Sequence, residues 1–315
     1  MSLWLRSSVT LALLGAILSG CAGSGGAPSS AIMPVSSQRV VASATGQTIP
    51  FAALADAAAK SDVVFFGEQH DDDETHRAEF ALLSAIGERR GKVVLSLEMF
   101  ERDVQPVLDA YLAGRLGEAE FRAQSRPWPN YETDYRPLVE LARAKGWPVI
   151  AANVPRRLAS SVSRRGLSAV DSMSAVDRPF VARDLQCPKD KYYENFVAVM
   201  GGGHGGAGGA PAAPPSGARP MTDLFYEAQC VKDETMAESI VSARERVGNA
   251  AIVVHFNGAF HSDFGLGTAS RVGRRSPGAK LVVVSAVPTP DPAKAKAAAF
   301  LDRGQYIILV RRTKP

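Results

Sequence analysis

Two segments of this chain end in the same spacing of glycine and histidine, each directly after a run of apolar residues. The first run begins at Val63 and ends in Gly67-Glu68-Gln69-His70, and the second begins at Ile252 and ends in Gly258-Ala259-Phe260-His261. Runs of β-branched and aromatic residues predict buried strands, and glycine permits a sharp turn where each strand ends. Because ligands of open α/β sheets bind at the carboxyl ends of the strands, we expect both histidines at one sheet edge.

Two further strand-like runs also end in polar residues. Residues 92–99 end in Glu98-Met99, and residues 147–153 end in Asn153. Each polar residue could instead cap a helix or satisfy a buried backbone group. The predicted sheet edge therefore collects Glu68, His70, Glu98, Asn153, His255, Asn257 and His261.

A divalent metal ion is one chemistry that these residue types support. Neutral imidazole and carboxylate groups are good ligands for zinc or manganese. The predicted ligands are His70, His261, Glu68 and Glu98, whereas His255 lies inside its run. A metal-bound water would become a nucleophile at neutral pH, and Glu68 or Glu98 would serve as general base. The same four residues could also be purely structural.

The rest of the chain alternates strand-like and helical patterns, which predicts a single α/β domain over residues 47–315. We expect a mostly parallel central sheet flanked by helices, with residues 305–310 as a candidate antiparallel edge strand. Further strands are expected at 92–99, 147–152, 250–257 and 280–287, and helices at 74–89, 104–113, 118–125, 135–145, 192–199 and 222–247.

The N-terminal residues predict a lipoprotein. Arg6 precedes a short apolar stretch, Val9 to Leu18, and Leu18-Ser19-Gly20-Cys21 matches the bacterial lipobox. Residues 1–20 are then the signal peptide, and Cys21 carries acyl chains such as palmitate that anchor the protein. The alternative is an ordinary secretory signal with an incidental cysteine. Ala22 in place of aspartate predicts the outer membrane, with the folded domain facing the periplasm.

Composition predicts two less ordered segments. Residues 21–46 are rich in small residues and should form a flexible tether. The Gly/Pro-rich stretch 201–220 buries too little apolar surface to fold. Cys187 and Cys230 flank this stretch, either as a disulfide or as two separate buried thiols. The net charge of +4 gives no indication of a nucleic-acid partner.

At this point the chain resembles a known family. The resemblance covers roughly residues 47–312 and is to the ChaN-like domain, a haem-binding lipoprotein module of the Tiki/erythromycin-esterase/TraB superfamily. The segments that carry it are Gly67–His70, Ser96–Phe100, Tyr131–Leu138, Phe225–Ala237 and His255–His261.

The resemblance implies non-covalent haem with a tyrosine phenolate as axial ligand, which suits ferric iron. Covalent attachment is excluded because the chain has no Cys-x-x-Cys-His. Tyr131 and Tyr135 are the first candidates for the axial ligand. His204 is the candidate for a second ligand or a propionate contact. The other candidate tyrosines are Tyr192, Tyr193 and Tyr226.

We therefore expect a haem-binding protein of iron uptake or storage rather than an enzyme. The resemblance also implies dimerisation on haem and delivery by an outer-membrane receptor. The alternatives are a metal-dependent hydrolase of the Tiki type, using Glu68, His70, Glu98 and His261, and an interaction lipoprotein with a vestigial site. Hemin absorbance would identify the first class, and metal-dependent peptide cleavage the second.

Overall fold

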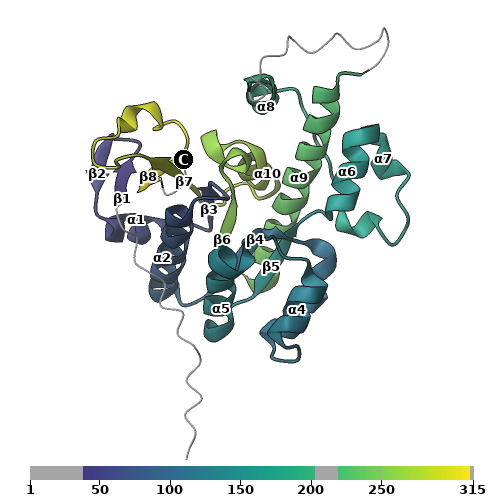
Figure 1. Ribbon diagram of the computed structural model, residues 1–315, viewed down its shortest axis with the longest axis horizontal. Coiled ribbons are helices and arrows are strands. Elements are labelled where there is room, and N and C mark those ends of the chain that lie inside the picture. Colours follow the sequence, from purple (N-terminus) through teal and green to yellow (C-terminus); the bar gives the residue numbers. More distant parts are fainter. Residues whose placement is uncertain (1–37, 203–218, 249, 313–315) are drawn as a thin grey trace, which may run out of the picture. The chain divides into compact units, whose positions relative to one another are not determined.

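A mixed eight-stranded sheet organises the folded chain (Figure 1). The computed structural model describes residues 38–202, 219–248 and 250–312. The strand order is β2-β1-β8-β7-β3-β6-β4-β5, and the neighbours from β8 to β5 are parallel. The strands are β1 (Gln38–Ala42), β2 (Gln47–Ile49), β3 (Val63–Glu68), β4 (Val93–Glu101), β5 (Val149–Asn153), β6 (Ile252–Gly258), β7 (Leu281–Thr289) and β8 (Tyr306–Arg311).

The structure corrects the sequence prediction at one side of this sheet. Gln38–Ala42 lies within the predicted tether but forms strand β1, in which Val40 and Val41 are buried. β1 pairs antiparallel with β8, and β8 pairs parallel with β7. The last strand is therefore neither antiparallel to β7 nor at the edge, because β1 and β2 cover it. The predicted signal peptide and the first part of the tether, residues 1–37, lie outside the described residues.

Helices pack on both faces of the sheet, because residues that alternate along the central strands are buried on both sides. Val64 and Phe66 belong to one apolar core with α1, α2, α3, α4 and α5, whereas Val63 and Phe65 belong to a second core with α9 and α10. The helices are α1 (Phe51–Ala58), α2 (Asp73–Arg90), α3 (Gln105–Leu112), α4 (Glu118–Ser125), α5 (Arg136–Lys145), α6 (Arg156–Arg165), α7 (Ser168–Asp171), α8 (Lys191–Gly202), α9 (Met221–Val247) and α10 (Gly267–Arg275).

Short helical turns lie in the connections between these elements. They are η1 (Arg102–Val104), η2 (Tyr131–Tyr135), η3 (Arg178–Phe180), η4 (Ala259–His261), η5 (Asp263–Gly265) and η6 (Ala297–Ala299). Within the described residues, no helix combines the length and the apolarity needed to cross a bilayer.

A disulfide joins Cys187, which precedes α8, to Cys230 within α9. This is the pairing that the sequence allowed, and it links the two elements that flank the Gly/Pro-rich stretch. Gly201 and Gly202 of that stretch end α8, and its residues 203–218, including His204, lie outside the described residues.

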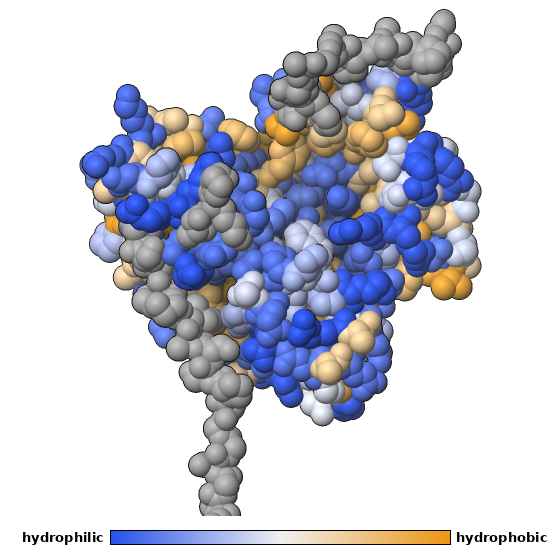
Figure 2. All heavy atoms as spheres, viewed as in Figure 1, coloured by the Kyte–Doolittle hydropathy of each residue, from blue (hydrophilic) through white to orange (hydrophobic). Residues whose placement is uncertain are grey.

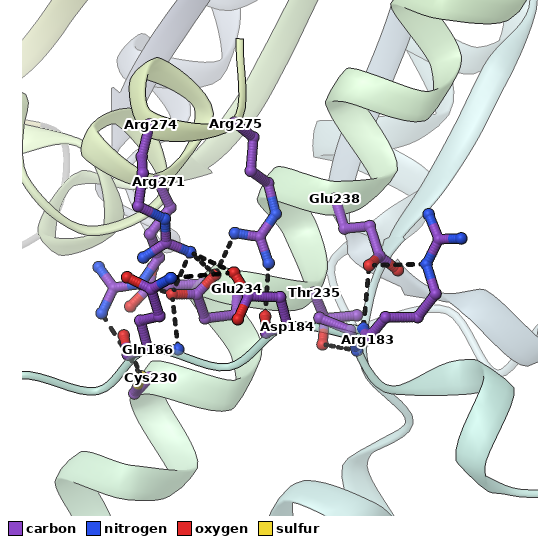
Figure 3. Close-up of polar contacts among 12 residues, drawn as sticks. Arg183, Asp184, Gln186, Cys230, Glu234, Thr235, Glu238, Arg271, Arg274 and Arg275 are labelled. Atoms are coloured by element: carbon purple, nitrogen blue, oxygen red, sulfur yellow. Dashed lines mark hydrogen bonds and ion pairs between the residues drawn. The ribbon is translucent and has the colours of Figure 1, made fainter. Parts of the chain in front are cut away.

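A buried carboxylate beside the disulfide ties α9 to α10 (Figure 3). Glu234 is fully buried and faces three guanidinium groups of α10. Arg271 Nε lies 3.3 Å from Glu234 Oε1, and Arg274 donates to Oε2 over 2.7 Å. Arg275 also donates to Oε2, and the Gln186 N–H donates to Oε1 over 3.2 Å. The cluster holds the segment before α8 against the two helices.

We predict that Glu234→Ala destabilises the protein by about 3 kcal/mol, because it leaves buried guanidinium groups without their counterion. The measurement is urea unfolding under non-reducing conditions. Glu245→Ala, an exposed change on the same helix, is the control and should shift stability by less than about 0.5 kcal/mol. Equal effects of the two substitutions would contradict the role assigned to the cluster.

Candidate functional site

The two Gly-x-x-His segments lie side by side. β3 and β6 are parallel neighbours, with Gly67 opposite Asn257 and Glu68 opposite Gly258. The His70 ring lies against Gly258, where a Cβ atom would be only 2.6 Å from His70 Nε2. Glycine at this position therefore makes room for the histidine of the other segment. The prediction that both segments end at one edge of the sheet is confirmed by this register.

Glu68 is the centre of a first polar network. Its Oε1 atom lies 2.5 Å from His70 Nδ1 and accepts a hydrogen bond from the Tyr135 hydroxyl over 2.6 Å. Burial opposes ionisation of Glu68, but hydrogen bonds with Glu79 and His70 and the charge of His76 lower its pKa to about 2. Burial likewise opposes protonation of His70, but its hydrogen bond with Glu68 outweighs this and raises the pKa of His70.

Helix α2 adds His76 and Glu79 to the first network. Asp72 caps this helix by accepting the Thr75 N–H over 2.9 Å. One turn later His76 Nδ1 lies 2.9 Å from Glu79 Oε2 and 3.8 Å from Glu68 Oε2. Burial would lower the pKa of His76, but the charge of Glu79 and the hydrogen bond to it raise this pKa to about 10. Burial also raises the pKa of Glu79, with the charge of Glu68 adding to the effect.

A second network forms around His261. Its Nε2 atom lies 3.2 Å from Glu98 Oε1, and its Nδ1 atom lies 2.7 Å from Asp233 Oδ1. The Gly258 N–H donates to Glu98 Oε2 over 2.8 Å, and the Tyr192 hydroxyl donates to Asp233 Oδ2 over 2.7 Å. Burial alone would lower the pKa of His261, but the charges of Glu98 and Asp233 raise it to about 10.

The four predicted metal ligands thus form two pairs, Glu68 with His70 and Glu98 with His261, that adjoin at Gly258. Among the described residues, a different group has its ligand atoms within 4.8 Å of one another. That group is Glu68, His76 and Glu79.

The remaining polar residues of the predicted edge satisfy local structure. Asn153 accepts the Val154 N–H over 2.9 Å, and Asn257 donates to Ser262 Oγ over 3.0 Å. His255 is fully buried beside Ser96, and burial lowers its pKa to about 4. These contacts are of the kind that the structural alternative predicts, but His255 Nε2 and Asn257 Oδ1 have no hydrogen-bond partner among the described residues.

A pocket of about 580 Å³ opens beside the second network, between α8 and the η4–η5 segment. Phe264 on its rim is 46% exposed and has a φ of 64°, an unusual and strained conformation for a bulky residue. Figure 2 shows hydrophobic residues gathered near α8, on a visible surface that is otherwise largely hydrophilic. The pocket is lined by Gln69, Lys191, Tyr192, Asn195, Ala198, Val199, Ala259, Phe260, Asp263, Phe264, Leu266, Asp302 and Arg303.

The structure separates the candidate tyrosines. Tyr131 packs in the core between Phe100 and Phe121, and Tyr135 is fully buried against Glu68. These two were the first candidates for haem ligation, and neither of them lines the pocket beside α8. The sequence alone could not show where these two tyrosines lie, because an amphipathic tyrosine is also common at the boundary of a protein core.

The tyrosines of α8 and α9 are placed differently. The Tyr193 hydroxyl donates to Asp223 over 2.6 Å, and the Tyr226 hydroxyl donates to the Pro188 carbonyl over 2.5 Å. Among the candidates, only Tyr192 lines the pocket. The pKa of Tyr192 is raised well above its usual value, first by burial and then by the charge of Asp233.

A second pocket, of about 640 Å³, lies at the carboxyl ends of β4 and β5. Trp128 lines it, but no tyrosine or histidine does. Arg126 in its wall is paired with Glu101 over 2.9 Å and with Asp103 over 2.6 Å. The cationic side chains of this second pocket are therefore largely paired with acidic residues of the protein itself.

The sequence analysis missed several residues of both networks. Asp233 lies in the middle of α9, and Glu79 and Asp134 also lie within helical segments. Helical interiors carry many acidic residues that face solvent, so only the packing shows that these three are buried. Two of the segments quoted for the family resemblance were available signals, because Phe225–Ala237 contains Asp233 and Tyr131–Leu138 contains Asp134.

The fold and the site define an α/β protein with two adjoining histidine–carboxylate networks and an apolar pocket at the carboxyl ends of its parallel strands. Residues 54–272 match the family described as "Haem-binding uptake, Tiki superfamily, ChaN". The chain belongs to this family.

One solved structure agrees with that assignment at the level of fold. The structure entitled "Cofacial heme binding to ChaN of Campylobacter jejuni" is 16% identical, with a TM-score of 0.65, and the match covers 87% of this chain and 97% of that one. The erythromycin esterase EreC in its open conformation has a TM-score of 0.44 and 12% identity over 88% of this chain and 83% of that one, too distant to carry an argument.

A plant protein also matches part of the chain. "Protein RETICULATA-RELATED 5, chloroplastic" of Arabidopsis thaliana is 25% identical over 196 residues, which is 60% of this chain. The match spans 25% of the length of that relative, so nothing about the whole plant protein transfers to this one.

The His261 network predicts a pH dependence of stability. The folded-state pKa of His261 is raised to about 10, above its ordinary 6.5, so its stabilising contribution is complete below about pH 6.5 and is lost as pH rises toward 10. Between pH 7 and 9 the parent should lose stability faster than His261→Gln, by on the order of 1 kcal/mol per pH unit. Urea unfolding across this range measures both slopes, and identical slopes would contradict the assigned charge state.

Proposed function

We propose that this protein binds haem non-covalently in the pocket beside α8, as part of haem or iron uptake or storage. The observation that carries the proposal is the composition of this pocket. The pocket lies at the end of the second Gly-x-x-His segment. It combines exposed apolar side chains, two cationic side chains and one of the candidate tyrosines. Membership of a haem-binding family supports the choice of ligand.

The lining suits the two chemical parts of haem. Phe260, Phe264 and Leu266 offer apolar surface for the porphyrin faces, and Val199 of α8 is 59% exposed on the other side. Lys191 and Arg303 also line the pocket, and cationic groups bind carboxylates such as propionates through charge-assisted hydrogen bonds. The larger pocket near Trp128 offers no comparable ligand for iron.

Tyr192 is the proposed axial ligand. Ferric haem supplies an iron ion that accepts an anionic tyrosine oxygen. The phenol proton of Tyr192 already points to Asp233, which is the group positioned to receive it. The guanidinium of Arg271 lies 5.2 Å from the centre of the Tyr192 ring and favours negative charge there. The protein without haem holds a neutral phenol, so ligation would require its proton to pass to Asp233 and from there to solvent. Because one proton is then released, binding should strengthen as pH rises.

We also propose that the chain is an outer-membrane lipoprotein anchored through Cys21, with its domain facing the periplasm. The lipobox and the small residue after it support this address. Dimerisation on haem and delivery by a receptor are predictions from the family resemblance. The hydrolase alternative has less support, because Glu98 and His261 are buried and paired with each other.

Hemin titration of the purified chain tests the haem proposal. We predict a Soret absorbance change in the parent, and an altered ferric spectrum with at least about tenfold weaker binding in Tyr192→Phe, because the phenolate ligand is lost. Tyr193→Phe is the matched control, since Tyr193 is the adjacent residue of α8 but does not line the pocket.

Two results would contradict this account. No spectral response in the parent would refute haem binding, and an unchanged spectrum in Tyr192→Phe would refute ligation by Tyr192. A changed spectrum in Tyr193→Phe or Tyr131→Phe alone would move the iron to another tyrosine.

The lipoprotein proposal predicts that Cys21→Ala abolishes acylation and releases the protein from the membrane fraction into the periplasm. Mass spectrometry of the N-terminal peptide and fractionation of the cells measure both effects. Cys187→Ala, which lies outside the lipobox, is the control and should retain its acyl chains. If the Cys21→Ala variant is still acylated and still partitions with the membrane, anchoring through Cys21 is refuted.

A further inference from the structure

We propose that Glu68, His76 and Glu79 bind one divalent transition-metal ion, at a site distinct from the haem pocket. Each residue offers one ligand atom, and these atoms lie within 4.8 Å of one another. Ligands about 2.1 Å from one ion lie roughly 3–4 Å apart, so small side-chain movements bring all three into contact with it. The proposal does not depend on haem binding.

Apart from the carboxyl–carboxylate contact between Glu68 and Glu79, which needs a shared proton, two buried oxygens of this group have no hydrogen-bond partner among the described residues. They are Glu68 Oε2 and Glu79 Oε1, and both glutamates are fully buried. A buried carboxylate oxygen without a partner is costly, so such atoms call for a bound ion, water or proton. Glu68 Oε2 lies 3.8 Å from His76 Nδ1, which places the unpartnered oxygen beside the third ligand.

The surrounding contacts orient the ligands as they do in metal sites. His76 Nε2 lies 3.2 Å from the His70 carbonyl oxygen and 3.5 Å from Asp134 Oδ2, which holds an N–H at Nε2 and turns Nδ1 toward the glutamates. An ion would displace the proton that Nδ1 carries in the metal-free protein. Metal-bound histidines usually donate their second N–H in this way. His70 and Tyr135 both contact Glu68 Oε1, which leaves Oε2 available for the ion.

The charges of the group favour a cation. Glu68, Glu79 and Asp134 are all nearly or fully buried, and His76 is the basic group among the described residues that contacts all three of them. Carboxylates buried together are stable only when they are matched by positive charge or by protons. A divalent ion would supply that charge.

The donor set narrows the identity of the ion. One imidazole nitrogen and two carboxylate oxygens suit Zn²⁺, Mn²⁺ or Fe²⁺, and the absence of a thiolate or thioether among these ligands argues against Cu(I). The His70 side chain is 44% exposed and pairs with the buried Glu68. Movement of the His70 side chain is therefore the route by which an ion would reach the site.

The test is Zn²⁺ binding to the hemin-free full chain, measured by calorimetry and by thermal unfolding. We expect one high-affinity equivalent in the parent, with Tm raised by about 5 °C or more when Zn²⁺ is about 100 times Kd. Glu79→Gln should abolish both effects. Glu74→Gln is the matched control, because Glu74 is also buried on α2 but does not belong to the ligand group, and it should retain both effects.

Two other outcomes of the Zn²⁺ experiment would overturn the proposal. Absence of Zn²⁺ binding in the parent would mean that the glutamates share a proton, and binding that persists in Glu79→Gln would place the ion elsewhere. If Glu79→Gln fails to fold, pulsed EPR of the parent with substoichiometric Cu²⁺ decides the question. Coupling to a single imidazole supports His76 as ligand, whereas two imidazoles or none would exclude this site.

Discussion

Burial of carboxylates at the carboxyl ends of the strands is the constraint on which the rest of this structure depends. Glu68, Glu98 and Asp233 are each at most 4% exposed. An unpaired buried charge costs several kcal/mol, so each of these acids needs a cation or a hydrogen-bond donor from another element. The imidazoles that follow the two glycines meet this need, and Gly258 provides the room for His70.

This constraint links the structure of the sheet edge to the proposed ligand pocket. Asp233 belongs to α9 and contacts His261, which follows β6. Asp233 also accepts a hydrogen bond from the hydroxyl of Tyr192 on α8. A change at the pocket tyrosine therefore alters the charge balance of a buried network. The Glu234 cluster and the disulfide hold α9 and the segment before α8 in place, so the tyrosine and its acceptor keep their distance.

Local sequence patterns predicted much of the fold and part of the site. Continuous apolar runs and helical patterns located the parallel strands and the main helices, and the repeated Gly-x-x-His spacing located the sheet edge. The sequence did not reveal β1, because Gln38–Ala42 is short and follows a tether-like composition. It also missed Asp233 and Glu79, because a buried acid within a helix has the same local sequence as an exposed one. The choice of Tyr192 over Tyr131 depended on tertiary structure, because both side chains are buried but only Tyr192 lines the pocket.

Hydrogen–deuterium exchange of the full chain with and without hemin tests the central claim most directly, because it reports where haem binds without any substitution. The account predicts that hemin slows exchange in α8, in residues 259–266 and around Arg303, which together form the pocket. Residues 126–129 and 156–160, which line the other pocket, should be unchanged. Protection confined to those residues, with no change in α8, would contradict the account.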